Sequence, residues 1–496
     1  MPFAQGVNAE SQFVPEPMIR FGTPAARRII AATVLGSGIA FLDGTIVNVA
    51  LPTIGDDLGT SLGGLQWIAN AYLVTLSALL LLGGSLGDRL GRRRMFVLGL
   101  AGFTVASLLC GAAPNTGALI AARAVQGVAG ALLVPGSLSI IAATFHPDDR
   151  AQAIGAWSGL AGVTTSIGPF LGGWLIDSVS WRLIFFVNAP LAAVAIFLAV
   201  RHVPETRAAV RGPMDVVGAA LATLTLAAAS YAAIEHTGVR SAVAAGVAVV
   251  GLLAFVLVER TVASPMLPLD IFRSAQFTGA NLVTLAVYAG FGAAMFLVVL
   301  RLQASLGYSA LEAGAAFVPF TLLLLVLSRA AGQLAQRVGA RLPMTAGPLV
   351  TAAGLLLLGR VGPGSTYLDG VLPGVVVIGL GMALTVAPLT AAVLAGAKAE
   401  LTGVASGVNN AVARLGGLLA VAAIPAIAGI SADLPIATSL DRGFARALSV
   451  AAAITAAGGL LAVLLVRRTA DVRPVTHATV LHACDHSAQA VEDRAP

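Results

Sequence analysis

Charged side chains are scarce in this chain: they make up 10% of its 496 residues, against 57% hydrophobic residues. Soluble globular proteins carry about 25% charged residues, so this composition excludes a water-soluble fold and indicates a polytopic membrane protein. The formal net charge of +6 does not point to nucleic acid, because arginines gather in the loops between apolar runs, as they do on the cytoplasmic side of membrane proteins.

Cysteine is nearly absent as well. Cys110 lies in an apolar run and Cys484 in the C-terminal tail, so we expect no structural disulfide. The tail also carries His477, His482 and His486, but their spacing fits no standard zinc pattern, and we expect a disordered tail without a metal. The first 20 residues lack the apolar core of a secretory signal. No phosphate-binding loop with its Lys and no nucleophile–base pairing is recognisable, which disfavours direct ATP drive and enzymatic chemistry.

Long apolar runs are what the chain has in abundance. About 20 apolar residues cross a bilayer as a helix, and fourteen runs reach that length, near 28–51, 65–86, 94–113, 117–143, 152–176, 183–201, 213–234, 241–258, 277–300, 311–334, 342–360, 370–395, 404–430 and 445–466. An even number places both termini on one side. Most of the 29 basic residues lie inside if that side is the cytoplasm, so we expect a cytoplasmic-membrane protein with both termini cytoplasmic. The basic residues then expected in outside loops are Arg182, Arg240, Arg301, Arg360, Arg442 and Arg446.

An internal repeat divides the chain. Gly84–Arg93 reads GSLGDRLGRR and Gly332–Arg341 reads GQLAQRVGAR, with glycines, leucine and arginines at identical spacing. Two parallel halves are typical of transporters. We therefore expect a cytoplasmic N-terminal segment, a six-helix bundle, a linker with an inserted pair of helices, a second six-helix bundle and a cytoplasmic tail, at residues 1–27, 28–201, 202–276, 277–467 and 468–496.

Asp43 is the only ionisable residue between Ile29 and Leu51. An acid near mid-span costs roughly 2.5–3.5 kcal/mol on insertion scales, so it normally faces protein or a water-filled interior. Burial disfavours the charged form of a carboxylate and a nearby cation favours it, so such a site can be tuned to exchange a proton. We interpret Asp43 as a proton-binding site; the alternative is a carboxylate that only holds helices in register. Asn48 is expected to donate an interhelical hydrogen bond.

Arg123, near the outer start of the fourth span, is the natural partner of Asp43 because pairing relieves the cost of a charge in the membrane. The alternative is an arginine that snorkels to the interface. Gln126 follows on nearly the same helix face. Arg414, deep in the thirteenth span, either faces a cavity or bonds backbone carbonyls, and Arg329 is expected to snorkel.

The loop after the second span has the features of a gate. Gly84 would let two helix ends approach, Gly91 would permit a tight turn, and Asp88 would pair with an arginine or lie at a helix N-terminus. The alternative is a basic loop that only sets topology. The proposed gate residues are Gly84, Asp88, Arg89, Gly91, Arg92 and Arg93.

Five stretches give the chain a family resemblance: LDGTIVNVALPTI, GSLGDRLGRRR, ARAVQGVAGALLVPGSL, GPFLGGWLID and WRLIFFVNAPLA, which begin at Leu42, Gly84, Ala122, Gly168 and Trp181. In this order and on these spans, they resemble the fourteen-spanner drug/proton antiporter family of the major facilitator superfamily. The resemblance implies the major facilitator fold, two six-helix bundles plus two inserted transmembrane helices.

The resemblance also implies roles for particular residues. The first-span Asp is linked to proton coupling in this family, and the Arg of the fourth span faces that acid across the cavity in related transporters. The GPFLGG run marks efflux in the antiporter branch. There Pro169 would bend the helix and the small residues would allow close contact with the opposite half. Its residues are Gly168, Pro169, Gly172 and Gly173.

The expected function is a proton-coupled secondary active exporter, an antiporter of amphipathic drugs or related small molecules that works by alternating access. It is not an enzyme, needs no cofactor beyond the proton gradient, and is expected to be a monomer. Alternatives are a dedicated exporter of a lipid or secreted natural product, or a non-transporting receptor or scaffold. Because no second acid stands deep in the second half, we expect monovalent cations or neutral compounds as substrates. Side chains expected to line the cavity are Phe41, Asn48, Trp67, Tyr72, Gln126, Met295, Phe296, Asn410 and Arg414.

Overall fold

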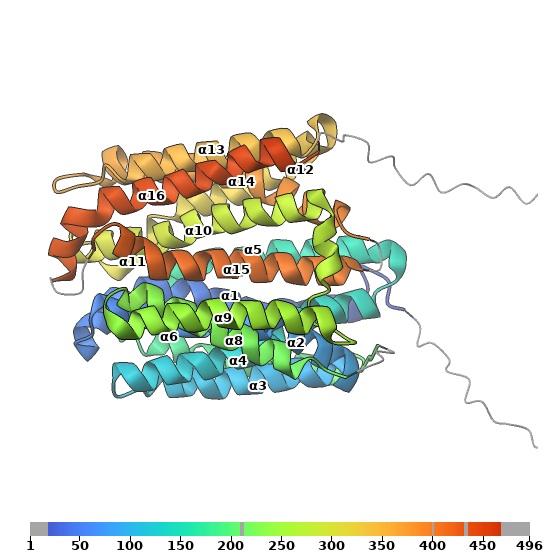
Figure 1. Cartoon of the computed structure of the whole chain (residues 1–496). Coiled ribbons are helices and arrows are strands. Elements are labelled where there is room, and N and C mark those ends of the chain that lie inside the picture. The colour runs from blue at the N-terminus through green and yellow to red at the C-terminus, as the bar shows by residue number, and fades with distance from the viewer. Residues whose placement is uncertain (1–17, 209–212, 399–400, 431–434, 468–496) are drawn as a thin grey trace, which may run out of the picture.

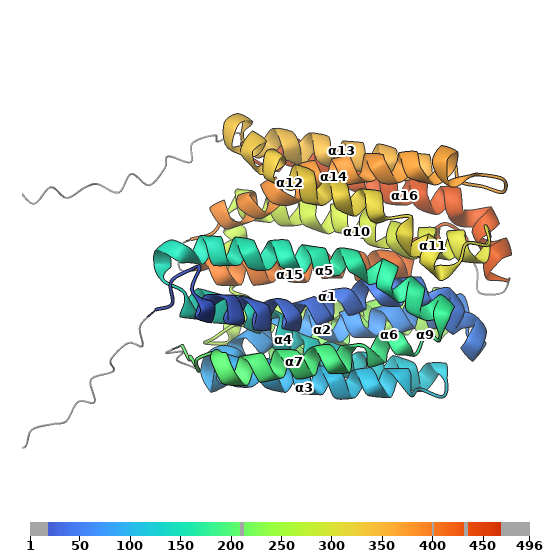
Figure 2. The ribbon, with the colours of Figure 1, turned by 180° about the vertical axis from the view of Figure 1, so that it is seen from behind.

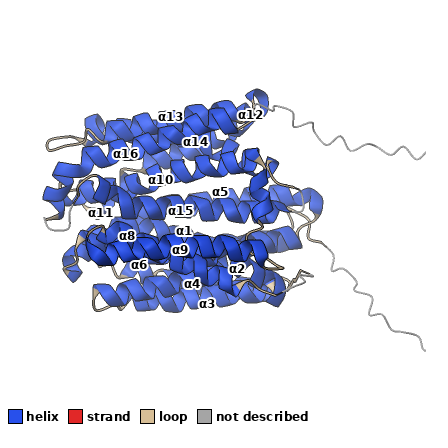
Figure 3. Cartoon of the chain, viewed as in Figure 1, coloured by secondary structure: helices blue, strands red, loops and turns tan. Residues whose placement is uncertain are grey.

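The structure is a computed structural model that describes residues 18–208, 213–398, 401–430 and 435–467. These residues form an all-helical bundle without a strand, apart from one isolated bridge between Ile19 and Phe145 (Figure 3). Fourteen helical segments within them are long and apolar enough to cross a membrane, which confirms the expected number of spans.

The first bundle is built from seven helices that make six spans, because α6 and α7 together form one span. Its members pack on one another through α2 with α4, α3 with α4, and α1 with α5 and α7. Their bounds are α1 Pro24–Leu58, α2 Leu62–Leu90, α3 Arg92–Gly111, α4 Thr116–Thr144, α5 Arg150–Ser178, α6 Leu183–Phe186 and α7 Asn188–His202, with a 3-10 turn at Pro147–Asp149.

The second bundle also makes six spans, with α11 and α12 forming one of them. Its main contacts join α13 with α14 and α16, and α10 with α15 and α16. Their bounds are α10 Ala275–Ala304, α11 Ala310–Ala315, α12 Val318–Val338, α13 Arg341–Leu358, α14 Leu372–Ala395, α15 Thr402–Ile427 and α16 Ile436–Leu465, with a π-helical turn at Tyr367–Val371 before α14.

The inserted pair, α8 (Val216–Glu235) and α9 (Gly238–Thr261), lies along one side of the seam between the bundles (Figure 1). Its helix α8 contacts α2 of the first bundle and α15 of the second. On the opposite side of the molecule, α5 runs along the seam (Figure 2). A 3-10 turn at Leu269–Arg273 leads from the pair into α10.

Local sequence explains where the helices begin and end. Thr23 caps α1 by accepting a hydrogen bond from the backbone N–H of Ala26 at 3.2 Å, and Pro24 occupies the first turn, where no donor is needed. Gly91 ends α2 with a φ of 117°, and Gly339 ends α12 with a φ of 82°. The two copies of the repeated loop therefore share a backbone conformation that favours glycine.

The two bundles are sealed together at one end. We call the end at which α1 starts and α16 finishes the termini end, and the opposite one the far end. At the far end, Gln66 and Asn70 of α2 donate to backbone carbonyls of α15 at 2.7–3.3 Å. Asp177 of α5 accepts from two backbone N–H groups of α11, and Gln303 of α10 donates to a carbonyl of α1. Hydrogen bonds between side chains of one bundle and backbone groups of the other thus hold the bundles together where α1 ends and α2 begins.

Gly83, next to the expected contact residue Gly84, packs directly against the backbone of α4. A Cβ on Gly83 would lie 2.0 Å from the carbonyl oxygen of Ala131, whereas one on Gly84 would meet Pro135 at an ordinary 3.6 Å. The expectation that Gly84 allows this approach is wrong by one residue, because one position along a helix turns the side chain by 100°.

Gly83→Ala is therefore expected to destabilise the first bundle by roughly 1–3 kcal/mol, the usual cost of overpacking. Gly87→Ala is the matched control, since a Cβ there meets nothing within 4 Å. Thermal unfolding of the two purified variants in detergent should show a lower midpoint for Gly83→Ala. Equal midpoints would contradict the close approach.

Candidate functional site

A buried ion pair stands in the first bundle. Asp43 of α1 and Arg123 of α4 meet at 2.5 Å between Oδ2 and Nη1, and their side chains are 1% and 2% exposed. The Arg123 Nε donates to the carbonyl of Ile68 on α2 at 3.2 Å. Arg123 thus lies two turns inside α4 and is enclosed by protein, which argues against a snorkelling side chain.

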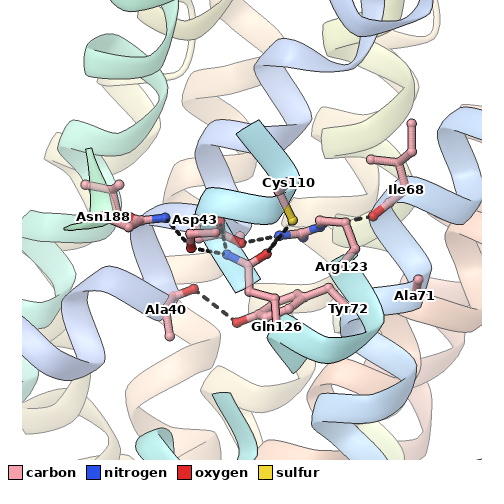
Figure 4. Close-up of polar contacts among 12 residues, drawn as sticks. Ala40, Asp43, Ile68, Ala71, Tyr72, Cys110, Arg123, Gln126 and Asn188 are labelled. Atoms are coloured by element: carbon pink, nitrogen blue, oxygen red, sulfur yellow. Dashed lines mark hydrogen bonds and ion pairs between the residues drawn. The ribbon is translucent and has the colours of Figure 1, made fainter. Parts of the chain in front are cut away.

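Gln126 completes the pair. Its Nε2 donates to the second carboxylate oxygen of Asp43 at 2.9 Å and to Ser107 Oγ at 2.8 Å, and its Oε1 accepts from Arg123 at 2.6 Å. The Cys110 thiol contributes a longer bond to the same Oε1 at 3.7 Å. Both carboxylate oxygens therefore have a donor, and the negative charge is compensated inside the protein (Figure 4).

Tyr72 and Asn188 close the site on two sides. The guanidinium carbon of Arg123 lies 4.4 Å from the centre of the Tyr72 ring, a cation–π contact, and the Tyr72 hydroxyl donates to the carbonyl of Ala40 at 3.3 Å. Asn188 at the start of α7 donates to Ser107 at 3.2 Å. Helices α1, α2, α3, α4 and α7 thus all contribute to one polar cluster.

The structure separates the expected cavity residues into groups. Asp43, Arg123, Gln126 and Tyr72 come together in the cluster just described, whereas Phe41 and Met295 are half-buried apolar side chains that take no part in its hydrogen bonds. Asn410 is exposed and donates to the carbonyl of Ser406, and Arg414 is half-buried.

Two of these expectations are wrong, those for Asn48 and Phe296. Asn48 donates to the carbonyl of Gly44 one turn back on its own helix at 3.2 Å, so it makes no interhelical bond there. Phe296 is 1% exposed inside the apolar core and lines no cavity. Trp67 packs against Tyr231 of the inserted pair, with ring centres 6.4 Å apart.

Sequence reasoning missed several members of the site. Ser107, Cys110 and Asn188 are polar residues inside apolar runs, and this was their only signal. The expected outside-loop residue Arg301 belongs instead to α10, is 3% exposed, and pairs with Asp441 of α16.

Two more buried carboxyl groups lie on the inserted pair. Asp215 caps α8 by accepting from Gly218 N–H at 2.7 Å, and Glu259 of α9 accepts from Leu267 N–H at 3.0 Å; they are 5% and 3% exposed. Glu259 was not singled out in the sequence, where it directly follows the apolar run near 241–258.

The gate loop is bound to the linker that follows the first bundle. Asp88 pairs with Arg92 at 2.7 Å, as one of the two expected arrangements requires. The acid at the N-terminus of α3 is Glu205, which accepts from the backbone N–H groups of Arg93 and Arg94, each at 3.1 Å. Arg89 donates to the carbonyl of Pro213 at 3.1 Å. These contacts tie the loop to the linker that leads to the inserted pair.

The GPFLGG run faces two neighbours. Gly168 and Gly172 pack on α1 of the same bundle, where an added Cβ would meet side chains of Thr45 and Ile46 at 2.3 Å and 3.0 Å. Gly173 and Pro169 instead contact α11 of the second bundle at backbone distance. Only part of the motif therefore makes the expected contact with the opposite half.

An apolar cavity of about 190 Å³ lies in the seam that the inserted pair covers. It is lined by residues of α2, α8, α9, α15 and the segment before α10. Two hydroxyl groups on its wall, Ser77 Oγ and Thr225 Oγ1, are buried without a hydrogen-bond partner. No grouping of side chains able to hold a metal occurs among the described residues, and the histidines and Cys484 of the tail lie outside them.

Two paired six-span bundles, sealed at one end and enclosing a compensated intramembrane charge, define a multi-pass membrane transporter. The model of the Major Facilitator Superfamily matches residues 33–421, and the chain belongs to this family. It is a transporter and not an enzyme.

Relatives and solved structures agree with this membership. The chain is 34% identical to multidrug resistance protein Stp of Mycobacterium tuberculosis over 413 residues, which are 82% of this chain and 76% of that one. It is 37% identical to puromycin resistance protein pur8 of Streptomyces alboniger over 85% of this chain and 84% of the relative. A bacterial homologue of the human lysosomal transporter Spinster has the same fold, with a TM-score of 0.66 at 15% identity over 89% of this chain and 97% of that chain.

Proposed function

We propose that this protein is a proton-coupled exporter of amphipathic drugs or related small molecules, located in the cytoplasmic membrane with both termini in the cytoplasm. The relatives named for multidrug and puromycin resistance support export of such compounds. The single observation that supports proton coupling is the buried Asp43–Arg123–Gln126 cluster. An intramembrane carboxylate in a buried ion pair is the group best placed to exchange a proton.

In this proposal, protonation of Asp43 removes the charge that holds Arg123. The guanidinium is then held only by Gln126, the carbonyl of Ile68 and the ring of Tyr72. Because α1, α2 and α4 all carry members of the cluster, a change in its charge alters how these helices pack. The far end is closed in the structure. If the termini lie in the cytoplasm, the far end is the outer one, and this closure corresponds to the inward-facing state of an alternating-access cycle.

Transport into proteoliposomes tests the proposal. Fluorescein and rhodamine 123 serve as probes of opposite charge, and pyranine trapped inside the vesicles reports proton movement. An imposed pH gradient should drive at least one probe against the direction of proton flow, and nigericin should abolish this uptake. Probe movement that is indifferent to the gradient would contradict proton coupling.

A second candidate, export of a lipid-like natural product, is favoured by the apolar seam cavity. An occupant that enters from the bilayer would meet apolar walls and the two unpartnered hydroxyls of Ser77 and Thr225. The same vesicle assay distinguishes the candidates when a nitrobenzoxadiazole-labelled fatty acid is added as a third probe. Gradient-driven movement of that probe alone would favour the second candidate.

A further inference from the structure

Arg414 carries a charge that the protein itself leaves uncompensated. It stands on α15, and in contrast to Arg123 it forms no salt bridge with a carboxylate among the described residues. Its Nε is buried without a hydrogen-bond partner. Leaving a guanidinium unpaired in the membrane is costly, and such residues normally mark a substrate or ion pathway.

The side chain points into the interface between the bundles. Positions 407, 414, 418 and 421 share one face of α15, at the helical spacing of three, four and seven residues. Gly407 faces Leu81 of α2, and the carbonyls of Leu418 and Val421 accept hydrogen bonds from α2. Arg414 therefore lies on the stripe that faces the first bundle, on the termini side of the sealed contacts.

Two tyrosines, one from each bundle, lie in the neighbourhood of Arg414: Tyr72 of α2 and Tyr288 of α10. The Tyr288 side chain is half-buried, as is that of Arg414. Aromatic rings beside a half-buried guanidinium offer apolar surface and positive charge together, which suits an amphipathic anion.

The Asp43 cluster also favours an anionic substrate over a cationic one. Asp43 is 1% exposed and both of its oxygens are bonded within the cluster, so no anionic group is offered to a cationic substrate there. Tyr72 contacts Arg123 with its ring and also lies in the neighbourhood of Arg414. Of the three charges Asp43, Arg123 and Arg414, the one left without a partner of opposite sign is the positive charge of Arg414.

We propose that Arg414 is the substrate-binding residue for an acidic group, and that this exporter prefers amphipathic anions, such as aromatic carboxylates or phenolates, to cations. The proposal rests on the exporter function and specifies its substrate class. It replaces the expectation of cations or neutral compounds, which relied on the absence of a second acid and left the uncompensated arginine out of account.

Equilibrium binding of matched dyes tests this assignment without a proton gradient. Fluorescein and rhodamine 123 share a xanthene ring system but carry opposite charges at pH 7.4. Their fluorescence anisotropy is titrated with the full-length protein in phosphatidylcholine nanodiscs, with empty nanodiscs as the blank. Wild type should bind fluorescein at least tenfold more tightly than rhodamine 123, roughly the value of one charge-assisted hydrogen bond.

Three variants separate charge from folding. Arg414→Gln should weaken fluorescein binding by roughly tenfold or more and leave rhodamine 123 unchanged or tighter, and Arg414→Lys should restore part of the loss. Arg329→Gln, on the exposed face of α12, is the matched control and should bind fluorescein as wild type does. Each variant is used only after it elutes as a single species on size exclusion.

Preference of wild type for rhodamine 123, or fluorescein binding that Arg414→Gln leaves unchanged, would overturn the assignment. Its failure is distinguishable from failure of the proposed function. Binding that depends on Arg414 without gradient-driven transport would leave the anion site standing and remove proton coupling. Gradient-driven transport with binding indifferent to Arg414 would do the reverse.

Discussion

Asp43→Asn is expected to reduce gradient-driven uptake in proteoliposomes to the level of protein-free vesicles. The amide has nearly the shape of the carboxyl group, but it binds no proton in the physiological range and carries no charge to hold Arg123. Exchange of labelled for unlabelled substrate without a gradient requires only alternating access, so it should persist. The measurement is the initial rate of uptake at several external pH values, together with the exchange rate at equal pH.

Folding is the obvious confounder, and the structure supplies its control. Removing one partner of a buried ion pair costs about 3–5 kcal/mol because the other charge is left uncompensated. Arg123 in Asp43→Asn is such a charge, with a side chain 2% exposed. The double variant Asp43→Asn with Arg123→Gln removes both charges and should recover thermal stability while coupling stays absent. Uptake with the wild-type dependence on pH in either variant would refute the role of Asp43.

The pairing of Asp43 with Arg123 was predictable because it follows from electrostatics alone. Each is a lone charge in a long apolar run, and a charge in the membrane needs compensation. Gln126 could be placed nearby, since it lies three residues from Arg123 on the same helix. The contribution of Asn188 was not predictable, because it depends on α7 packing beside α3, a contact between helices that are distant in the chain.

The misassigned residues show where helix patterns lose information. Asn48 has an acceptor on its own helix four residues back, and the pattern of apolar residues does not reveal which carbonyl a side chain will choose. Gly83 and Gly84 are adjacent, and only the rotation of α2 against α4 decides which one meets the neighbouring backbone. Glu205 caps α3 across more than 100 residues of chain, which no local signal encodes.

Gly173→Ala is expected to have the second large effect, by preventing the far end from closing. A Cβ on Gly173 would lie 2.4 Å from the Cα of Leu311 and 2.6 Å from the carbonyl oxygen of Ala310, both backbone atoms of α11. Backbone atoms cannot rotate aside as a side chain can. An overpacking cost of roughly 1–3 kcal/mol falls on the sealed state alone and should shift the population away from it by about tenfold or more.

The shift in population away from the sealed state can be measured as the accessibility of a thiol at the far end. In a background of Cys110→Ala and Cys484→Ser, Gln303→Cys places a thiol at the far-end seal, where the native side chain donates to the carbonyl of Val49. An impermeant maleimide applied from the far-end side should label it faster when Gly173→Ala is also present, and transport should slow by a similar factor.

Two glycines of the same helix isolate the cause. Gly159→Ala adds a methyl group with nothing within 4 Å, so it should change neither labelling nor transport. Gly172→Ala presses on Ile46 of the same bundle at 3.0 Å, so it should lower thermal stability without altering accessibility. Labelling by Gly173→Ala that equals that of Gly159→Ala would show that α5 and α11 do not form the seal. If the three variants differ as expected, the efflux motif has separate parts: Gly173 serves the contact between bundles, and Gly172 serves the packing of α5 on α1.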